Sequence, residues 1–158
     1  MLKPCPCGSN KSFSLCCENY INQTRSPKTA EQLMRSRYCA YTLKNSEYIA
    51  KTYAMSKQAG NSIEDIAEWA EQTTWLLLEV IDTDYADNKF HFVEFVATYL
   101  VENEVWRMHE KSRFVKEQEK WCYLDGDVFE HKLIKKLSRN ENCPCLSGKK
   151  FKRCCMRT

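Results

Sequence analysis

The chain has 158 residues, of which 43% are hydrophobic and 28% charged, with a formal net charge of +3. This length suits one domain of ordinary size or a small domain with appendages, and no apolar run approaches the ~20 residues that span a bilayer. The start carries one Lys with no apolar stretch behind it, which excludes a secretory signal, so we expect a cytoplasmic protein.

The small net charge hides a segregation of charge along the chain. Residues 29–131 are acidic overall, whereas residues 132–158 hold nine Lys or Arg residues and a single acid, Glu141. Only this basic tail, and not the protein as a whole, suggests an acidic partner.

Ten cysteines are many for a chain of this size. Disulfides usually join distant positions in secreted chains, whereas clustered thiols in a reducing compartment more often hold a metal. Four thiolates without His are typical of a closed structural zinc site, and adjacent ligands leave little room for an iron–sulfur cluster. We therefore expect two zinc ions, with free thiols, disulfides or an iron–sulfur centre as alternatives. Eight of the cysteines form two clusters with the same spacing, in which Cys-Pro-Cys is followed after eight residues by Cys-Cys. The first cluster is Cys5, Cys7, Cys16 and Cys17, and the second is Cys143, Cys145, Cys154 and Cys155.

Two further cysteines, Cys39 and Cys122, each lie beside aromatic residues. They could form a redox pair, but a buried free Cys more often packs as a small hydrophobe. We expect packing for both.

Helices are predicted for the first half of the region between the clusters. A polar linker at 19–28 ends at Pro27, after which Thr29 can cap a helix with an apolar stripe. A break at Asn45-Ser46 precedes a short helix at 47–53, and Ser62 with Asp65 begins another at 63–71.

Strands are predicted for the second half. Apolar segments at 74–81 and 90–101 and an alternating segment at 105–115 are separated by polar turns at 82–89 and 103–104. A last turn at 117–120 leads to a short strand at 121–124, which we expect to stop at Asp125-Gly126. Helices followed by meandering strands predict an α+β fold with an antiparallel sheet.

The cysteine clusters resemble the SEC-C motif, the zinc knuckle at the C-terminus of the preprotein translocase ATPase SecA. The whole chain resembles the YchJ family, bacterial proteins with a SEC-C knuckle at each end of a nuclear-transport-factor-2-like domain. This resemblance implies a curved antiparallel sheet packed on N-terminal helices as a cone, with knuckles at 1–20 and 139–158 and a middle domain at 27–130. It implies no particular activity. Besides the knuckles, the resemblance rests on segments 33–41, 92–97, 109–114 and 121–126.

Both knuckles depart from the usual continuation of the motif, Cys-Pro-Cys-Gly-Ser-Gly-Lys. Leu146 stands at the first Gly position of the C-terminal copy, and Asn10 at the second in the N-terminal copy. If the turn requires a positive φ, Leu146 introduces a steric cost there, while all four thiols remain.

Three polar residues, Glu94, His109 and Glu110, are candidates for lining a pocket in the cone. Alternation along a strand places His109 and Glu110 on opposite faces, which disfavours them as a joint acid/base pair. A stripe of aromatic residues in this region is more often core than ligand cage, and its members are Trp75, Phe92, Tyr99, Trp106 and Trp121.

The C-terminal knuckle carries basic residues on either side of an aromatic one, in the run Lys149, Lys150, Phe151, Lys152 and Arg153. A basic surface held rigid by zinc suits an acidic partner, which could be nucleic acid, a ribosome surface or an acidic protein. In SecA the similar knuckle binds partners, and the resemblance extends this only by analogy. The alternative is that the tail docks on the acidic middle region of the same chain.

Two hypotheses of different classes follow. The first is a non-enzymatic, zinc-stabilised adaptor whose C-terminal knuckle contacts an acidic partner. The second is an enzyme or small-molecule binder that uses the pocket of the middle domain. A pocket with convergent polar groups would favour the second hypothesis, and a cone filled by Trp and Phe side chains would favour the first.

Overall fold

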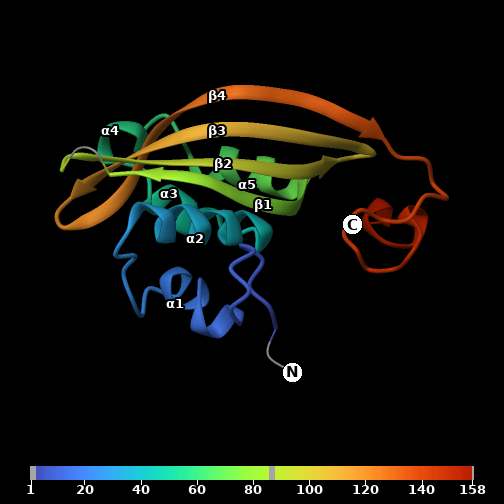
Figure 1. Cartoon of the computed structure of the whole chain (residues 1–158), viewed down its shortest axis with the longest axis horizontal. Coiled ribbons are helices and arrows are strands. Elements are labelled where there is room, and N and C mark those ends of the chain that lie inside the picture. Colours follow the sequence, from blue (N-terminus) through green and yellow to red (C-terminus); the bar gives the residue numbers. More distant parts are fainter. Residues whose placement is uncertain (1–2, 86–87, 158) are drawn as a thin grey trace.

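The computed structural model describes residues 3–85 and 88–157, in which an arched sheet lies over a layer of helices (Figure 1). This arrangement confirms the expected α+β fold with a curved antiparallel sheet. The helices are α1 (Glu18–Ile21), α2 (Ala30–Thr42), α3 (Ser46–Lys51), α4 (Met55–Gln58) and α5 (Ile63–Gln72). The strands are β1 (Thr73–Asp84), β2 (Phe90–Val101), β3 (Glu104–Glu117) and β4 (Lys120–Lys136), and the 3-10 turns are η1 (Phe13–Leu15), η2 (Phe151–Arg153) and η3 (Cys155–Arg157).

The predicted helix starts are confirmed by their caps. Thr29 Oγ1 accepts a hydrogen bond from the Gln32 backbone N–H at 3.1 Å, and Ser62 Oγ accepts one from Asp65 at 3.1 Å. These bonds satisfy backbone donors that the first turn of a helix otherwise leaves unpaired. Two short helices were not expected: α1, which begins at Glu18 and extends into the segment predicted as a polar linker, and α4, which follows the predicted helix at 47–53.

The four strands form one antiparallel sheet in the order β1-β2-β3-β4. Two predicted strand ends are wrong. β1 continues to Asp84 into the predicted polar turn, of which residues 86–87 lie outside the described residues, and β4 runs past Asp125-Gly126 to Lys136.

Side-chain contacts explain why β4 does not stop where Asp-Gly suggests a turn. The Arg113 guanidinium donates two hydrogen bonds to the Asp125 carboxylate, at 2.8 and 2.6 Å, from the facing position on β3. A Cβ at Gly126 would lie 2.1 Å from Glu110 Oε1, so the missing side chain makes room for Glu110. Here Gly is a packing residue and not a strand breaker.

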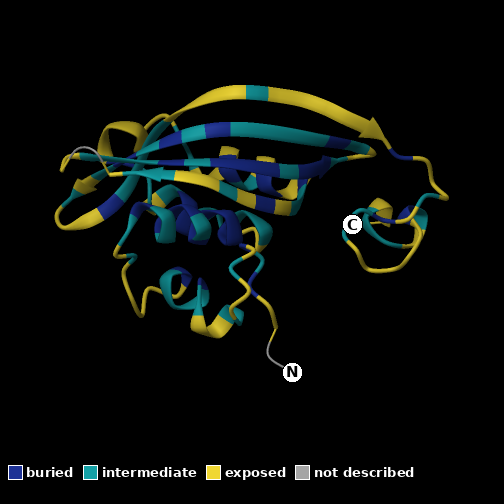
Figure 2. Ribbon diagram, viewed as in Figure 1, coloured by how far each residue is buried: buried dark blue, intermediate teal, exposed yellow. Residues whose placement is uncertain are grey.

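The core lies between the helices and one face of the sheet, which we call the inner face. Val93, Phe95 and Ala97 of β2 and Phe114 of β3 pack there against α2 and α3 (Figure 2). The other face of the sheet is the outer face, and β4 is exposed along most of its length.

The two ends of the chain are placed differently. The N-terminal knuckle lies beneath α2, whereas the C-terminal knuckle lies beyond the end of the sheet (Figure 1). Within residues 3–85 and 88–157, no helix has the length and apolar character needed to cross a membrane.

Candidate metal centres and the pocket

The first cysteine cluster brings four sulfur atoms together. The Sγ atoms of Cys5, Cys7, Cys16 and Cys17 all lie within 4.8 Å of one another. The Sγ–Sγ distance is 3.8 Å for Cys7–Cys16 and for Cys16–Cys17. Four sulfurs at ~2.3 Å from a tetrahedral zinc ion lie about 3.8 Å apart, so the cluster has the spacing that zinc requires.

The backbone around this cluster explains the spacing of the motif. The Cys5 N–H donates to the Lys11 carbonyl at 2.8 Å, which closes a small hairpin that carries Cys5 and Cys7. Its tip needs left-handed backbone at Gly8 (φ 73°) and Asn10 (φ 60°). η1 then delivers Cys16 and Cys17 to the open side of the hairpin.

The second cluster repeats this construction. Cys143, Cys145, Cys154 and Cys155 have all four Sγ atoms within 4.8 Å of one another, and the Cys143 N–H donates to the Lys149 carbonyl at 2.8 Å. Both clusters can therefore hold a metal ion, and their all-thiol composition is consistent with zinc.

The turn at Leu146 confirms the expected strain. Leu146 has φ 61°, at the position where the N-terminal copy has Gly8. A non-Gly residue in this region costs about 1 kcal/mol, whereas Asn10, the non-Gly residue at positive φ in the N-terminal copy, is of a type that tolerates this region. The Leu146 side chain is 93% exposed, so no packing contact offsets this cost.

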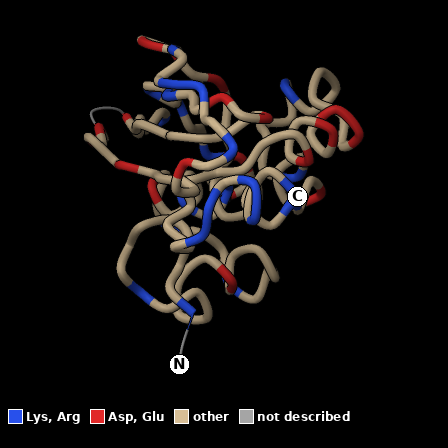
Figure 3. The backbone as a smooth tube through the Cα atoms, turned by 90° about the vertical axis from the view of Figure 1, so that its right-hand side faces the viewer, with Lys and Arg blue, Asp and Glu red and all other residues tan. Residues whose placement is uncertain are grey.

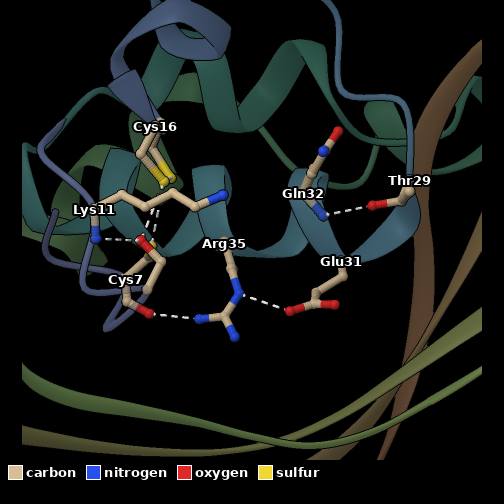
Figure 4. Close-up of polar contacts among 9 residues, drawn as sticks. Cys7, Lys11, Cys16, Thr29, Glu31, Gln32 and Arg35 are labelled. Carbon is tan, nitrogen blue, oxygen red and sulfur yellow. Dashed lines mark hydrogen bonds and ion pairs between the residues drawn. The ribbon is translucent and has the colours of Figure 1, made fainter. Parts of the chain in front are cut away.

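The N-terminal knuckle is docked on the middle domain through its own backbone. Arg35 of α2 donates from Nη1 to the Cys7 carbonyl at 2.7 Å and from Nε to Glu31 at 2.8 Å (Figure 4). A Cβ at Gly8 would lie 3.2 Å from the Leu78 carbonyl of β1, so the turn packs closely on the sheet as well. The knuckle is thereby part of the main core, and Cys5, Cys7 and Cys17 are buried in it.

A cavity of about 180 Å³ lies between the inner face of the sheet and α2. Its walls are mostly aromatic, and two charged side chains, Arg37 and Glu110, also line it. The cone is therefore not filled by aromatic side chains. Aromatic side chains line the cavity from α2, from the segment after α3, from α5 and from all four strands. They are Tyr38, Tyr41, Tyr53, Trp69, Trp75, Phe95, Tyr99, Phe114 and Tyr123.

Arg37 is only 6% exposed, and four groups hold it in place. Its Nη1 donates to the Ile49 carbonyl at 2.8 Å and to Thr52 Oγ1 at 2.6 Å. Its guanidinium carbon lies 4.4 Å from the ring centre of Tyr53 and 4.7 Å from that of Tyr123. These cation–π contacts offset part of the cost of burying the charge.

Glu110 is 8% exposed and faces the same cavity from β3. Its Oε1 accepts hydrogen bonds from Ser112 at 2.7 Å and from the Tyr123 hydroxyl at 3.0 Å. Burial, and after it the neighbouring Glu110 carboxylate, raise the pKa of Tyr123 above its usual value, so this phenol remains a donor. Arg37 and Glu110 both belong to the described residues, and no hydrogen bond or ion pair joins their side chains directly.

Two of the three residues proposed for the pocket lie elsewhere, which corrects that expectation. Glu94 and His109 are on the outer face, where Glu94 Oε1 and His109 Nε2 are 2.6 Å apart. The strand alternation that separates His109 from Glu110 also pairs His109 with Glu94, because Val96 faces His109 across the sheet and Glu94 is two residues away on the same face. Only Glu110 lines the cavity, and sequence reasoning missed Arg37.

Comparison with known proteins decides the family. The family described as YchJ, middle NTF2-like domain, matches residues 29–126, and the SEC-C motif matches residues 3–19 and 139–157. The chain belongs to the YchJ family. A UPF0225 protein of Enterobacter sp. (strain 638) is 38% identical over 156 residues, which are 98% of this chain and 99% of that protein.

Two solved structures of SEC-C proteins resemble this YchJ-family chain. The solution structure of RPA3114, a SEC-C motif containing protein from Rhodopseudomonas palustris, has a TM-score of 0.75 and 31% identity, and the match covers 81% of this chain and all of that one. The crystal structure of a SEC-C motif containing protein from Psychrobacter arcticus has a TM-score of 0.71 and 32% identity, and the match covers 97% and 95% of the two chains.

Cys39 has a neighbour that its sequence position does not reveal. Its Sγ lies 3.6 Å from Cys5 Sγ, whereas Cys122 Sγ lies 3.7 Å from the Lys120 carbonyl that accepts its hydrogen bond. Hydrogen bonds from Cys17 and then from Cys39 lower the pKa of Cys5 to about 6. Cys39 belongs to α2 and lies outside the spacing of the SEC-C motif, so spacing alone could not place it beside the cluster.

The C-terminal knuckle attaches to the sheet through one aromatic residue. Phe151 is 1% exposed and packs against Leu100, Val105 and Leu137. Phe151, although it stands between basic residues in the sequence, is therefore not part of their exposed surface. Phe151 points inward because it fills the apolar contact between the knuckle and the end of the sheet.

The basic side chains of this knuckle point away from that contact. Lys149, Lys150 and Arg153 are exposed and Lys152 is half-buried. Figure 3 shows Lys and Arg positions along the backbone at the end of the molecule that carries the C-terminal knuckle. Lys150 donates to Asn142 Oδ1 within the knuckle at 2.9 Å. In the described part of the chain, none of the four forms an ion pair with an acid of residues 29–131.

Proposed function

We propose that this YchJ-family protein is a non-enzymatic, zinc-stabilised adaptor of the cytoplasm whose C-terminal knuckle binds an acidic protein partner. The observation that carries the proposal is a basic surface beyond the end of the sheet that forms no ion pair with the described acids of residues 29–131 (Figure 1). Its residues are Lys149, Lys150, Lys152 and Arg153. A self-docked tail would place these side chains against acids of the middle region, and no such pair exists among the described residues.

Zinc would hold this surface in shape. Each knuckle supplies four thiolates and no His, so a bound zinc ion would have no open position for water or substrate. Its contribution is therefore structural. Metal binding of this kind can supply ~10–16 kcal/mol, which explains how so short a segment folds with only a small apolar contact of its own.

The internal repeat shows that the basic surface is not required by the knuckle fold. Aligning the two motifs places Ser12, Ser14 and Leu15 at the positions of Lys150, Lys152 and Arg153. Both copies form the same hairpin and 3-10 turn. The extra positive charge is therefore not needed for folding of the C-terminal copy, and we assign it to the function of that copy.

A protein partner is favoured over nucleic acid by Leu146. This fully exposed apolar side chain stands on strained backbone in the same knuckle as the basic residues. A phosphate backbone offers nothing to a Leu side chain, whereas an acidic protein surface with an apolar residue can contact both features. Strain that is not offset by packing is characteristic of functional positions.

The test uses variants that the fold is known to accept. Lys150→Ser, Lys152→Ser and Arg153→Leu together give the C-terminal knuckle the residues of the N-terminal one. We expect this triple variant to weaken binding of a Glu/Leu peptide of ~20 residues at least about tenfold, with a melting temperature unchanged within about 2 °C, since exposed charges add little stability. Binding by the natural chain should weaken as salt rises.

Polyuridylate of equal charge serves as the comparison ligand, and Leu146→Asn as the second variant, because Asn tolerates a positive φ. We expect Leu146→Asn to weaken peptide binding and to leave polyuridylate unaffected. Peptide binding that the triple variant does not change would contradict the proposal. Tighter binding of polyuridylate than of the peptide, insensitive to Leu146, would identify nucleic acid as the partner.

A second candidate function is favoured by the cavity. Arg37 and Glu110 are buried and line it, each held by hydrogen bonds, but no ion pair joins them. Buried charges that are not paired with each other are characteristic of ligand sites. An engineered apolar cavity of ~150 Å³ binds benzene, so this cavity suits a single-ring compound with an acidic group for Arg37 and a donor for Glu110.

A further inference from the structure

We propose that Cys39 is a fifth thiol of the N-terminal metal centre and exchanges with Cys16 as its fourth ligand. The proposal concerns metal binding by the N-terminal knuckle alone, and it does not depend on any partner of the C-terminal one. It extends the metal site from the SEC-C motif to a helix of the middle domain.

The distance between sulfur atoms supports this assignment. Cys39 Sγ and Cys5 Sγ are 3.6 Å apart, close to the 3.8 Å that separates Cys16 Sγ from Cys7 Sγ and from Cys17 Sγ. Two sulfurs bound to one tetrahedral zinc ion lie about 3.8 Å apart. Cys39 therefore lies at ligand spacing from Cys5, just outside the four motif thiols that all lie within 4.8 Å of one another.

Burial distinguishes the two exchangeable residues. Cys39 is 0% exposed, whereas Cys16 is half-buried and is the most accessible cysteine of the motif. The Cys16 sulfur also lies 3.3 Å from Ser9 Oγ, a hydroxyl that can hydrogen-bond the Cys16 sulfur after it leaves the metal and takes up a proton. Cys5, Cys7 and Cys17 are buried between these two and would remain bound throughout.

The docking of the knuckle holds Cys39 in range. Arg35, one turn before Cys39 on α2, bonds the Cys7 carbonyl at 2.7 Å. The hairpin therefore keeps a fixed distance from the helix that carries Cys39. Only a side-chain rotation and a small shift of the ion are needed for exchange.

The exchange is balanced without an oxidant or reductant. The Cys39 thiol gives up its proton and forms a zinc–sulfur bond, while the bond to Cys16 breaks and the Cys16 thiolate takes up a proton. Four thiolates bind the ion before and after, so the charge of the centre is unchanged. Removal of Cys16 then leaves a complete four-sulfur site.

The C-terminal knuckle provides a matched control, because it has no fifth thiol. Its centre borders Leu100, Val105, Leu137 and Phe151, which are all apolar. The position equivalent to Cys16 is Cys154, which likewise lies near a Ser hydroxyl, with Ser147 Oγ 3.2 Å from its sulfur. The same substitution can thus be made with and without a reserve ligand.

The test is cadmium-113 NMR of the full chain with each site loaded, combined with chelator competition. A tetrathiolate site resonates downfield of a site with three thiolates and an oxygen. We expect Cys16→Ser to keep the N-terminal tetrathiolate resonance and to change cadmium affinity less than about threefold. In Cys154→Ser the C-terminal site should lose its tetrathiolate resonance. Its cadmium affinity should fall at least about tenfold, as is usual when part of a metal site is removed.

Two further variants complete the test. Cys39→Ala alone should keep the tetrathiolate resonance, because Cys16 is present, and Cys16→Ser with Cys39→Ala should lose it. The proposal is overturned if Cys16→Ser loses the N-terminal tetrathiolate resonance as Cys154→Ser loses the C-terminal one. Both of these variants keep Cys39. It is also overturned if the double variant matches Cys16→Ser, or if the N-terminal site takes up no cadmium.

Discussion

Cys7→Ser is expected to lower the melting temperature of the whole chain by at least about 10 °C, whereas Cys145→Ser is expected to lower it by less than about 3 °C. The two residues hold equivalent places in the two copies of the motif. Cys7 is fully buried in the main core, and its carbonyl accepts the Arg35 hydrogen bond from α2. Cys145 lies in a knuckle attached through one small apolar cluster.

The size of this difference follows from what each metal stabilises. A structural metal contributes several kcal/mol, and in a chain of this size 1 kcal/mol shifts the melting temperature by roughly 2–4 °C. Loss of the N-terminal metal removes a layer of the core beneath α2. Loss of the C-terminal metal frees a knuckle that covers only the end of the sheet.

The melting temperatures of the two variants are measured by circular dichroism at a wavelength that reports helix, with the same metal supply for each protein. The control for hydroxyl burial is Ser36→Ala, which changes a buried polar group of α2 without touching a thiol of either cluster. Equal melting temperatures for Cys7→Ser and Cys145→Ser would show that the N-terminal knuckle does not support the middle domain.

Arg37→Met is expected to weaken binding of 4-hydroxybenzoate to the cavity by at least about tenfold. This probe has one ring, a carboxylate for Arg37 and a hydroxyl that can donate to Glu110. A hydrogen bond between charged groups contributes ~1.5–3 kcal/mol, which corresponds to roughly ten- to hundredfold in affinity. Glu110→Gln should weaken binding less, since Gln still accepts a hydrogen bond.

Tryptophan fluorescence reports this binding, because Trp69 and Trp75 line the cavity. His109→Gln is the matched control, since it alters an ionisable residue on the outer face of the same strand. Arg37→Lys separates charge from geometry and should retain part of the affinity. Saturable binding that is indifferent to Arg37→Met, or no binding of 4-hydroxybenzoate, benzoate or phenol, would rule out this use of the cavity.

Much of the fold could be predicted because local signals and burial agree in it. Thr29 and Ser62 cap the helices that they were expected to cap, and the alternation in 105–115 identified a half-buried strand. The error at Asp125-Gly126 arose because the residues were interpreted as a turn signal. Their tertiary roles, pairing with Arg113 and making room for Glu110, are invisible without the sheet register.

The two candidate sites differ in how far sequence could define them. A metal cluster built from one short motif is determined by spacing, so all eight thiols could be assigned from the repeat. The cavity is assembled from α2, the segment after α3, α5 and all four strands, and no spacing rule connects Arg37 with Glu110. Cys39 was missed for the same reason, because its proximity to Cys5 depends on how the knuckle docks.

Native mass spectrometry of protein purified without chelator tests the central claim, that each knuckle is a four-thiolate zinc site, most directly. The natural chain should carry two zinc ions, and Cys145→Ser should carry one. Bound iron, a mass deficit of disulfides within the clusters, or a metal-free chain that melts at the same temperature would contradict it.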